Sequence, residues 1–219
     1  KMNAMDNLKV KIYADGADRD GMLEMYAKPY IQGFTTNPTL MKKAGITDYK
    51  AFAHEILQAI PDRPISFEVF ADEFTDMERQ ALEIKTWGEN VYVKIPVTNT
   101  RQETAYDLIE HLSGAGVHLN VTAILTLEQV QNVADALKDG PDSIVSVFAG
   151  RIADTGLDPV PVMQEALTLL NVAPNAELLW ASPREVLNIY QADNIGCHII
   201  TATNDLIRKL ALGGKDLAE

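Results

Sequence analysis

The sequence contains little cysteine and no long hydrophobic run. Cys197 is the only cysteine among its 219 residues, so an internal disulfide is impossible. This excludes a small secreted scaffold held by disulfides and suits a reducing cytoplasm. No run of 18 apolar residues occurs, and the N-terminal sequence KMNAMDNLKVK lacks the apolar core of a signal peptide. We therefore expect a cytoplasmic protein with no membrane partner.

Basic residues are also in short supply. The chain has 19 Lys and Arg residues against 31 Asp and Glu residues, which gives a formal net charge of −12. Such a surface repels nucleic-acid backbones and anionic lipids, so neither is an expected partner, and an anionic ligand needs a local binding group. The apolar content of 47%, by contrast, is too high for a disordered chain and predicts a single domain over residues 1–219.

Histidines are few and scattered, so no metal site is expected. The four lie far apart in the sequence, without the spacing that is typical of metal ligands. They are His54, His111, His118 and His198.

Eight short runs rich in apolar and β-branched residues recur along the chain and predict strands. Between most of them apolar residues recur at helical spacing, as at Phe52, Ile56 and Ile60. Strands and helices therefore alternate. The predicted strands cover residues 10–14, 31–36, 65–70, 91–95, 117–122, 143–148, 177–181 and 197–201.

Four helix starts are predicted from capping-box spacing, in which Ser or Thr is followed three residues later by Glu or Gln. Each comes soon after a predicted strand. The pairs are Thr75 with Glu78, Thr100 with Glu103, Thr126 with Gln129, and Ser182 with Glu185, the last with Pro183 at the first helical position.

This alternation of eight strands with helices predicts an α/β fold, specifically a closed (β/α)8 TIM barrel. A doubly wound parallel sheet is the alternative. Its usual glycine fingerprint is missing, however, because DGADRDG after the first strand is not G-x-G-x-x-G. At 219 residues the chain is short for a barrel, so long insertions are excluded.

In such a barrel, reactive groups belong at the C-terminal ends of the strands, where the loops into the helices meet. Polar and charged residues do gather at that end of most predicted strands, which makes it the candidate site. They are Asp15, Thr35, Thr36, Asn37, Glu68, Lys94, Asn120, Thr122, Ser146, Arg151, Ser182 and Arg184, with the aromatic Phe148 among them.

Lys94 lies in the otherwise apolar strand VYVKIP. Period-two alternation puts it on the face opposite Val93 and Ile95, so it points into the barrel if those two residues pack against helices. Burial favours the neutral amine, which is a nucleophile towards a carbonyl carbon. A lysine at a strand end could equally extend to water or pair with a carboxylate.

Two carboxylates are expected near Lys94. Glu68, in the apolar segment SFEVFA, could transfer protons with a raised pKa or form a buried ion pair with Lys94. Asp15 could instead cap the helix expected to start near Asp18. Position alone does not choose between these interpretations.

An anion site is predicted where Arg151 in FAGRIAD meets the SPRE turn at residues 182–185. A helix N-terminus beside two arginines attracts a phosphate monoester. Two simpler interpretations stay open: Ser182 could only cap its own helix, and Asn37 in TTNP could be a turn residue before Pro38.

Six segments resemble, in the same order, the signature segments of the transaldolase family, which includes the short transaldolases and fructose-6-phosphate aldolase. The resemblance runs from about Ile12 to about Lys209. It implies a (β/α)8 barrel that acts on sugar phosphates without a metal or an organic cofactor. The segments are GFTTNPTLM, FEVFAD, VYVKIPVT, LNVTAILT, SVFAGRIAD and WASPRE.

The resemblance also implies roles for single residues. Lys94 would form a Schiff base with the substrate, and Asp15 would act as general acid and base on a substrate hydroxyl. Glu68 and Thr122 would position a water molecule for proton transfer. The residues implied to bind the dihydroxyacetone portion are Asn37, Asn120 and Ser146, and those implied to bind phosphate are Arg151, Ser182 and Arg184.

Transaldolases pass a three-carbon dihydroxyacetone unit to an acceptor aldose phosphate, whereas the related aldolases release it. Those aldolases usually carry Gln and Tyr where Glu68 and Phe148 stand, so the resemblance favours transfer. Two functions of a different class stay open, a pyridoxal-phosphate enzyme and a non-catalytic sugar-phosphate binder. Short family members commonly form ring-like decamers through a further C-terminal helix, which the ending GGKDLAE does not match, so a homo-oligomer is left open.

Overall fold

The computed structural model of the chain describes residues 7–16 and 18–218, and its centre is a closed barrel of eight parallel strands. Each strand pairs with the next in the sequence, and β8 returns to pair with β1, which excludes the open doubly wound sheet. The strands are β1 (Lys11–Gly16), β2 (Ile31–Thr36), β3 (Ile65–Glu68), β4 (Val91–Pro96), β5 (Leu119–Ile124), β6 (Ser143–Val147), β7 (Ala176–Trp180) and β8 (Ile199–Ala202).

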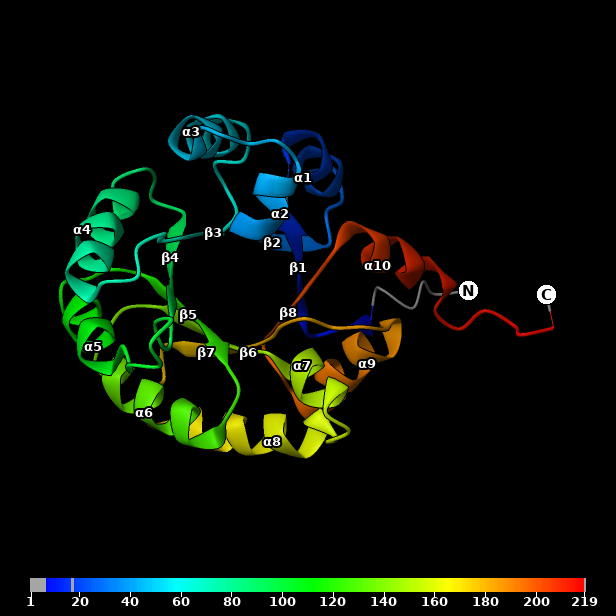
Figure 1. The fold of residues 1–219 in the computed structure, drawn as a ribbon. Coiled ribbons are helices and arrows are strands. Elements are labelled where there is room, and N and C mark those ends of the chain that lie inside the picture. The colour runs from blue at the N-terminus through cyan, green and yellow to red at the C-terminus, as the bar shows by residue number, and fades with distance from the viewer. Residues whose placement is uncertain (1–6, 17, 219) are drawn as a thin grey trace.

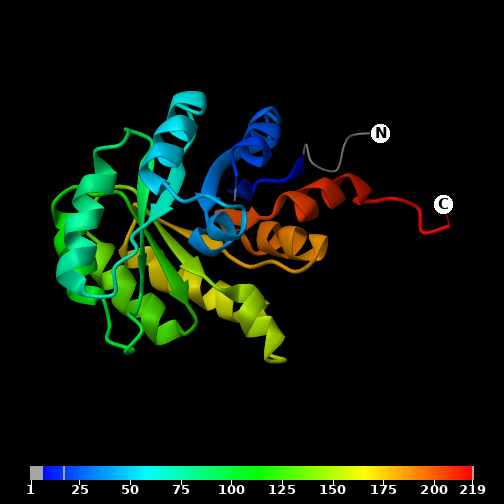
Figure 2. The same cartoon turned by 45° about the horizontal axis from the view of Figure 1, so that its top comes forward.

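Helices follow the strands, and most of them surround the barrel on its outside, as Figure 1 shows along the barrel and Figure 2 shows from a tilted view. They are α1 (Arg19–Tyr26), α2 (Pro38–Lys43), α3 (Tyr49–Ala59), α4 (Phe74–Lys85), α5 (Tyr106–Gly114), α6 (Leu127–Leu137), α7 (Ala149–Asp154), α8 (Pro159–Leu169), α9 (Val186–Ile195) and α10 (Asn204–Lys209). Short 3-10 turns, Leu170–Val172 and Leu210–Leu212, continue α8 and α10. The predicted (β/α)8 barrel is confirmed.

Alternation along the strands separates the two faces of the sheet. In β4, Val91, Val93 and Ile95 are buried, whereas Tyr92 and Lys94 between them are half-buried. The buried set packs into the large apolar core between the strands and the helices. Lys94 therefore points to the inside of the barrel, as the spacing predicts.

A second, smaller apolar cluster fills the inside of the barrel below the polar residues at the strand ends. Gly33 is part of this packing, because a Cβ there would lie 2.4 Å from Cζ of the Tyr13 ring. The polar side chains at the strand ends thus lie above an apolar layer inside the barrel. The cluster consists of Tyr13, Ile144, Leu179, Ala181 and Ile199, with Tyr92 and Phe148 packed against it.

Only one of the four helix starts predicted from capping-box spacing is confirmed. The Thr126 hydroxyl accepts from the Gln129 backbone N–H at 3.1 Å, and the Gln129 side chain accepts from the Thr126 N–H in return. Helix α4 begins at Phe74 after Glu73, so Thr75 lies inside it.

The other two predicted starts are wrong because the loops after β4 and β7 are longer than expected. A bridge between Thr98 and Thr104 closes a turn after β4, and α5 begins only at Tyr106. Helix α9 begins at Val186, where the Asn188 side chain accepts from the backbone N–H groups of residues 184 and 185.

Two short helices that the periodicity does not predict, α2 and α7, follow β2 and β6 directly. With six residues each, they are too short to show an amphipathic repeat. They carry Asn37, at the start of α2, and Arg151, within α7, to the open end of the barrel. In the described ranges 7–16 and 18–218, the helices all fall short of the length and apolar character that a membrane crossing requires.

Candidate active site

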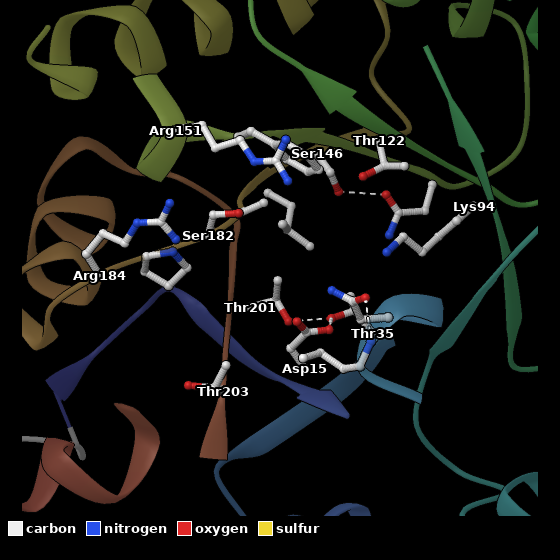
Figure 3. A pocket seen from close by; sticks show the side chains of 17 residues that line it. Asp15, Thr35, Lys94, Thr122, Ser146, Arg151, Ser182, Arg184, Thr201 and Thr203 are labelled. Atoms are coloured by element: carbon white, nitrogen blue, oxygen red, sulfur yellow. Dashed lines mark hydrogen bonds between the residues drawn. The ribbon is translucent and has the colours of Figure 1, made fainter. Parts of the chain in front are cut away.

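A cavity of about 250 Å³ opens at the C-terminal ends of the strands. Every residue that the sequence singles out for the site lines this cavity, except Thr36 and Glu68. In Figure 3 Lys94 and Thr122 lie on one side of the cavity, and Arg151 and Arg184 lie on the opposite side. The lining residues are Asp15, Thr35, Asn37, Leu40, Lys94, Asn120, Thr122, Ser146, Phe148, Arg151, Leu179, Ala181, Ser182, Pro183, Arg184, Thr201 and Thr203.

Lys94 extends from β4 into the cavity rather than out to bulk water. Its Nζ donates a hydrogen bond to the backbone carbonyl of Thr36, at 3.0 Å, at the end of β2. It forms no ion pair with a carboxylate of the described residues, so the expected alternative of a paired lysine is not observed. The amine is held by one neutral acceptor, which leaves it free to meet a ligand.

Glu68 is the neighbour of Lys94 in the barrel, since the two residues are directly paired between β3 and β4. It is half-buried and stands just outside the cavity lining. Burial raises the pKa of its carboxyl, while Lys94 lowers it and Asp15 raises it. Glu68 and Lys94 thus interact electrostatically, but their charged groups are not close enough to form an ion pair.

Asp15 lies near the end of β1 and lines the cavity. Burial raises the pKa of its carboxyl, and both the Lys94 ammonium and a hydrogen bond from the Thr35 hydroxyl oppose this rise. It does not cap α1, which begins at Arg19 after Asp18. The capping interpretation of Asp15 is therefore wrong.

Asn120 and Ser146 form a buried hydrogen-bonded pair on β5 and β6. The Ser146 hydroxyl donates to Oδ1 of Asn120 at 2.6 Å, and the Asn120 amide donates to the Ser66 hydroxyl at 3.1 Å. These bonds fix the orientation of the amide. Thr122 follows on the same face of β5, where Ala123 bends the strand with a φ of +62°.

Asn37 caps a helix and also lines the cavity. Its Oδ1 accepts from the backbone N–H groups of Thr39 at 3.0 Å and Leu40 at 3.1 Å, so it caps α2 ahead of Pro38. It also lines the cavity. Because the cap uses only the amide oxygen, the amide NH₂ is left to donate to a ligand.

The arginine side of the cavity is formed by α7 and the loop after β7. Arg184 is held by Asp154, with Nη2 and Oδ2 2.5 Å apart, and this ion pair lowers the pKa of Asp154. The guanidinium of Arg151 lies over the Phe148 ring, 4.8 Å from its centroid. The two arginines give this side of the cavity a positive charge that can attract an anion.

Ser182 has an unusual backbone conformation and does not cap α9. Its φ of +56° is in the left-handed region. Gly150 in α7 packs directly against it, since a Cβ at Gly150 would lie 1.5 Å from the Ser182 carbonyl oxygen. This close approach brings the two arginine-bearing segments together, and only glycine permits it.

Sequence reasoning missed Thr201 and Thr203, which line the cavity, and Tyr49, which supports Glu68 from outside it. Thr201 is buried and hydrogen-bonded to Thr35. Tyr49 reaches from α3 to the end of β3, where its hydroxyl accepts from the Glu68 backbone N–H at 3.0 Å. Alternation along β8 could have identified Thr201 as inward-facing, but the Tyr49 contact depends on how a helix packs against the barrel.

Sequence comparison assigns the family. The family model described as "Transaldolase/Fructose-6-phosphate aldolase" matches residues 12–218, nearly the whole chain. This chain belongs to that family. Among its relatives in the family, a "Probable transaldolase" of Dehalococcoides mccartyi is 30% identical over 202 residues, which cover 92% of this chain and 90% of the relative. A "Probable transaldolase" of Methanococcus maripaludis is 33% identical, with coverage of 92% and 89%.

Solved structures with low sequence identity share the barrel fold of this transaldolase/aldolase family member. Dihydrodipicolinate synthase from Rhodopseudomonas palustris aligns with a TM-score of 0.60 at 15% identity, over 95% of this chain and 77% of that one. A 2,3-dimethylmalate lyase aligns with a TM-score of 0.61 at 14% identity, over 95% and 81%. At such identities the likeness concerns the fold alone.

Proposed function

We propose that this chain is a transaldolase that uses Lys94 as a Schiff-base nucleophile. It would transfer a dihydroxyacetone unit from sedoheptulose 7-phosphate to glyceraldehyde 3-phosphate, giving erythrose 4-phosphate and fructose 6-phosphate. One observation carries the proposal: a single cavity holds the Lys94 amine, the Asp15 carboxyl and two arginines on the side opposite the amine. A ketose phosphate needs these three groups at its carbonyl, its hydroxyl and its phosphate.

The first half of the proposed reaction cleaves the donor sugar. The Lys94 amine attacks the ketone carbon, and loss of water gives an iminium ion. Asp15 takes the proton from the hydroxyl on the fourth carbon while the bond between the third and fourth carbons breaks. The bonding electrons move into the iminium, so that an enamine remains on Lys94 and an aldose phosphate leaves.

The second half runs these steps in reverse with a new aldehyde. The enamine carbon attacks the acceptor carbonyl, and Asp15 returns its proton to the new hydroxyl. A water molecule positioned by Glu68 and Thr122 then hydrolyses the iminium and frees Lys94. Because Glu68 lies beside Lys94 and burial raises the pKa of its carboxyl, it is suited to hold a proton and pass it to water.

The remaining lining residues bind the two ends of the sugar. Asn37, Asn120 and Ser146 offer amide and hydroxyl groups to the hydroxyls of the dihydroxyacetone portion. Arg151, Ser182 and Arg184 bind the phosphate. The chemistry needs no metal and no organic cofactor, and the expected location in the cytoplasm stays a prediction.

Release of free dihydroxyacetone, as in fructose-6-phosphate aldolases, is the second candidate function. Phe148 favours transfer over release because its ring lines the cavity without offering a proton to the enamine. A non-catalytic sugar-phosphate binder is a weaker candidate, since binding alone gives no reason to place an amine beside two carboxyls of raised pKa without an ion pair among the described residues.

The test is an assay with fructose 6-phosphate as donor, run with and without erythrose 4-phosphate as acceptor. A transaldolase forms sedoheptulose 7-phosphate only when the acceptor is present and releases little dihydroxyacetone without it. Acceptor-independent release at a comparable rate would favour the aldolase instead. Lack of turnover under both conditions, with binding retained, would overturn both enzymatic assignments.

A further inference from the structure

On the β1 side of the cavity, side chains from three neighbouring strands place two hydroxyls close to one carboxyl. In the barrel β1 lies between β2 and β8. Asp15 is paired with Thr35 on β2, and Thr201 on β8 is paired with Tyr13. Figure 3 shows Asp15, Thr35 and Thr201 grouped together on this side of the cavity.

Two hydrogen bonds connect these side chains. The Thr35 hydroxyl donates to Oδ1 of Asp15 at 2.9 Å. The hydroxyl oxygens of Thr35 and Thr201 lie 2.6 Å apart. Both threonines are buried, with exposed fractions of 3% for Thr35 and 7% for Thr201, so bulk water does not compete for these bonds.

The direction of the bonds follows from the number of hydrogens. An ionised carboxylate can only accept, and a hydroxyl has one hydrogen to give. While Asp15 is ionised, the hydrogen of Thr35 is therefore used on Asp15, and Thr201 must be the donor to Thr35. When Asp15 carries a proton, the same chain can reverse, with Asp15 donating to Thr35 and Thr35 to Thr201.

We propose that Thr201 is a positioning residue that acts on Asp15 through Thr35: its hydroxyl holds Thr35 in the orientation in which Thr35 donates to the carboxylate. Thr201 thereby favours the ionised, proton-accepting form of Asp15. This inference rests on the proposed function of Asp15 as the base that removes the substrate hydroxyl proton.

Few other charges act on this carboxyl. Lys94 on β4 lowers its pKa, and Glu68 on β3 is electrostatically coupled to it, while Arg151 and Arg184 line another side of the same cavity. The neighbouring strands, with sequences IQGFTT and IITA, contribute no titratable side chain. The charged residues of the helices beside β1 are on the outer surface, where Arg208 of α10 pairs with Glu24 of α1. A change in the titration of Asp15 in a threonine variant can therefore be traced to the hydroxyl chain.

The loss of the Thr201 hydroxyl should change the pKa of Asp15 in one direction only. The hydrogen bond from Thr35 lowers the pKa of Asp15, so weakening that bond raises the pKa. A base works only above its pKa, and the acid limb of kcat/KM must then move to higher pH. We expect Thr201→Val to lower kcat/KM by roughly two- to tenfold on the acid limb, the effect of one hydrogen bond, and to approach the wild-type value at high pH.

The experiment measures kcat/KM against pH for the wild type, Thr201→Val, Thr201→Ser, Thr35→Val and the Thr35→Val/Thr201→Val double variant. Thr201→Ser keeps the hydroxyl, so the acid limb of its kcat/KM profile should match that of the wild type. If Thr201 acts through Thr35, removing it in the Thr35→Val background should have no further effect. An acid limb of Thr201→Val identical to that of the wild type would overturn the proposal. So would a double variant in which Thr201→Val shifts the acid limb as far as it does in the wild-type background.

A second measurement is independent of activity. Titration of the Asp15 carboxyl carbon by ¹³C NMR should show a higher midpoint in Thr201→Val than in the wild type, and an unchanged midpoint overturns the proposal. If the wild type binds sugar phosphates but has no turnover, the proposed function fails, and the titration still decides the role of Thr201. Thr201→Ala replaces the valine variant should the latter fail to fold.

Discussion

At the scale of single residues, Phe148 is the side chain that bears most directly on the fate of the proposed enamine. It follows β6, is half-buried against the apolar cluster inside the barrel and lines the cavity. The Arg151 guanidinium lies over its ring. The ring therefore covers part of the cavity with carbon where a polar side chain would hold water.

Phe148→Tyr should increase release of free dihydroxyacetone. The added hydroxyl supplies a proton donor near the enamine, and a placed proton donor typically accelerates such a step by 10² or more, so that even partial placement should raise release roughly tenfold. A coupled assay for dihydroxyacetone, without acceptor aldose, measures the change. Phe148→Leu is the control, because it removes the ring without adding a proton donor. Equal release by the tyrosine variant and the wild type would contradict this role of the ring.

The inward-facing residues were predictable from alternation, and their hydrogen bonds were not. Period-two spacing places Lys94 and Asn120 inside the barrel from their own strands alone. The bond between Thr35 and Thr201 joins residues 166 positions apart and exists only because β8 closes onto β1. The ion pair of Arg184 with Asp154 likewise depends on α7 meeting the loop after β7, which no local pattern encodes.

At the scale of helices and strands, the contact between α7 and the loop after β7 shapes the arginine side of the cavity. Gly150 touches the backbone of Ser182, and the two segments carry Arg151 and Arg184. The backbone of Ser182 is held in the left-handed region, a conformation that costs a non-glycine residue about 1–3 kcal/mol and persists when its surroundings impose it. Packing between the two elements thus sets the spacing of the arginines.

Gly150→Ala should damage both stability and phosphate binding. The new Cβ would lie 1.5 Å from the Ser182 carbonyl oxygen, so one backbone segment must move. Overpacking of this kind costs about 1–3 kcal/mol of unfolding free energy. Displacement of Ser182 and Arg184 should also raise the KM for phosphorylated substrates more than it lowers kcat. Thermal unfolding and steady-state kinetics measure the two effects.

Gly114→Ala is the matched control for this substitution. Gly114 ends α5, and a Cβ there would meet no heavy atom of the described residues within 4 Å. Alanine in a helix is favoured over glycine by up to about 1 kcal/mol, so this variant should be as stable as the wild type or slightly more so. A Gly150→Ala variant that matched Gly114→Ala in stability and KM would refute the packing argument.

The order and approximate bounds of the strands followed from the sequence, whereas most helix starts did not. Strands are marked by continuous β-branched runs because they are buried on both faces. A Ser or Thr three residues before Glu or Gln is a weaker signal, since it also fits loops. The Thr100–Glu103 pair lies in such a loop, where Glu103 pairs with Arg101 and the Thr100 hydroxyl donates to Asp72.

At the scale of the whole molecule, the closed barrel gathers a few positively charged side chains in one cavity of an otherwise acidic protein. The chain carries a net charge of −12, yet the cavity holds Lys94, Arg151 and Arg184 with Asp15 as its one acidic lining residue among those described. Local cations of this kind can bind an anionic sugar against the overall charge. The number of strands was predictable from the sequence, but this concentration of charge follows from the closure of the barrel.

Lys94 is the group that bonds covalently to the substrate in the proposed mechanism, and every later step depends on that bond. Incubation with fructose 6-phosphate, reduction with borohydride and peptide mapping by mass spectrometry test this directly. We predict a stable three-carbon or six-carbon adduct on the peptide that contains Lys94, and no adduct in a Lys94→Arg variant. An unmodified Lys94 after reduction of an active preparation, or an adduct on another lysine, would contradict it.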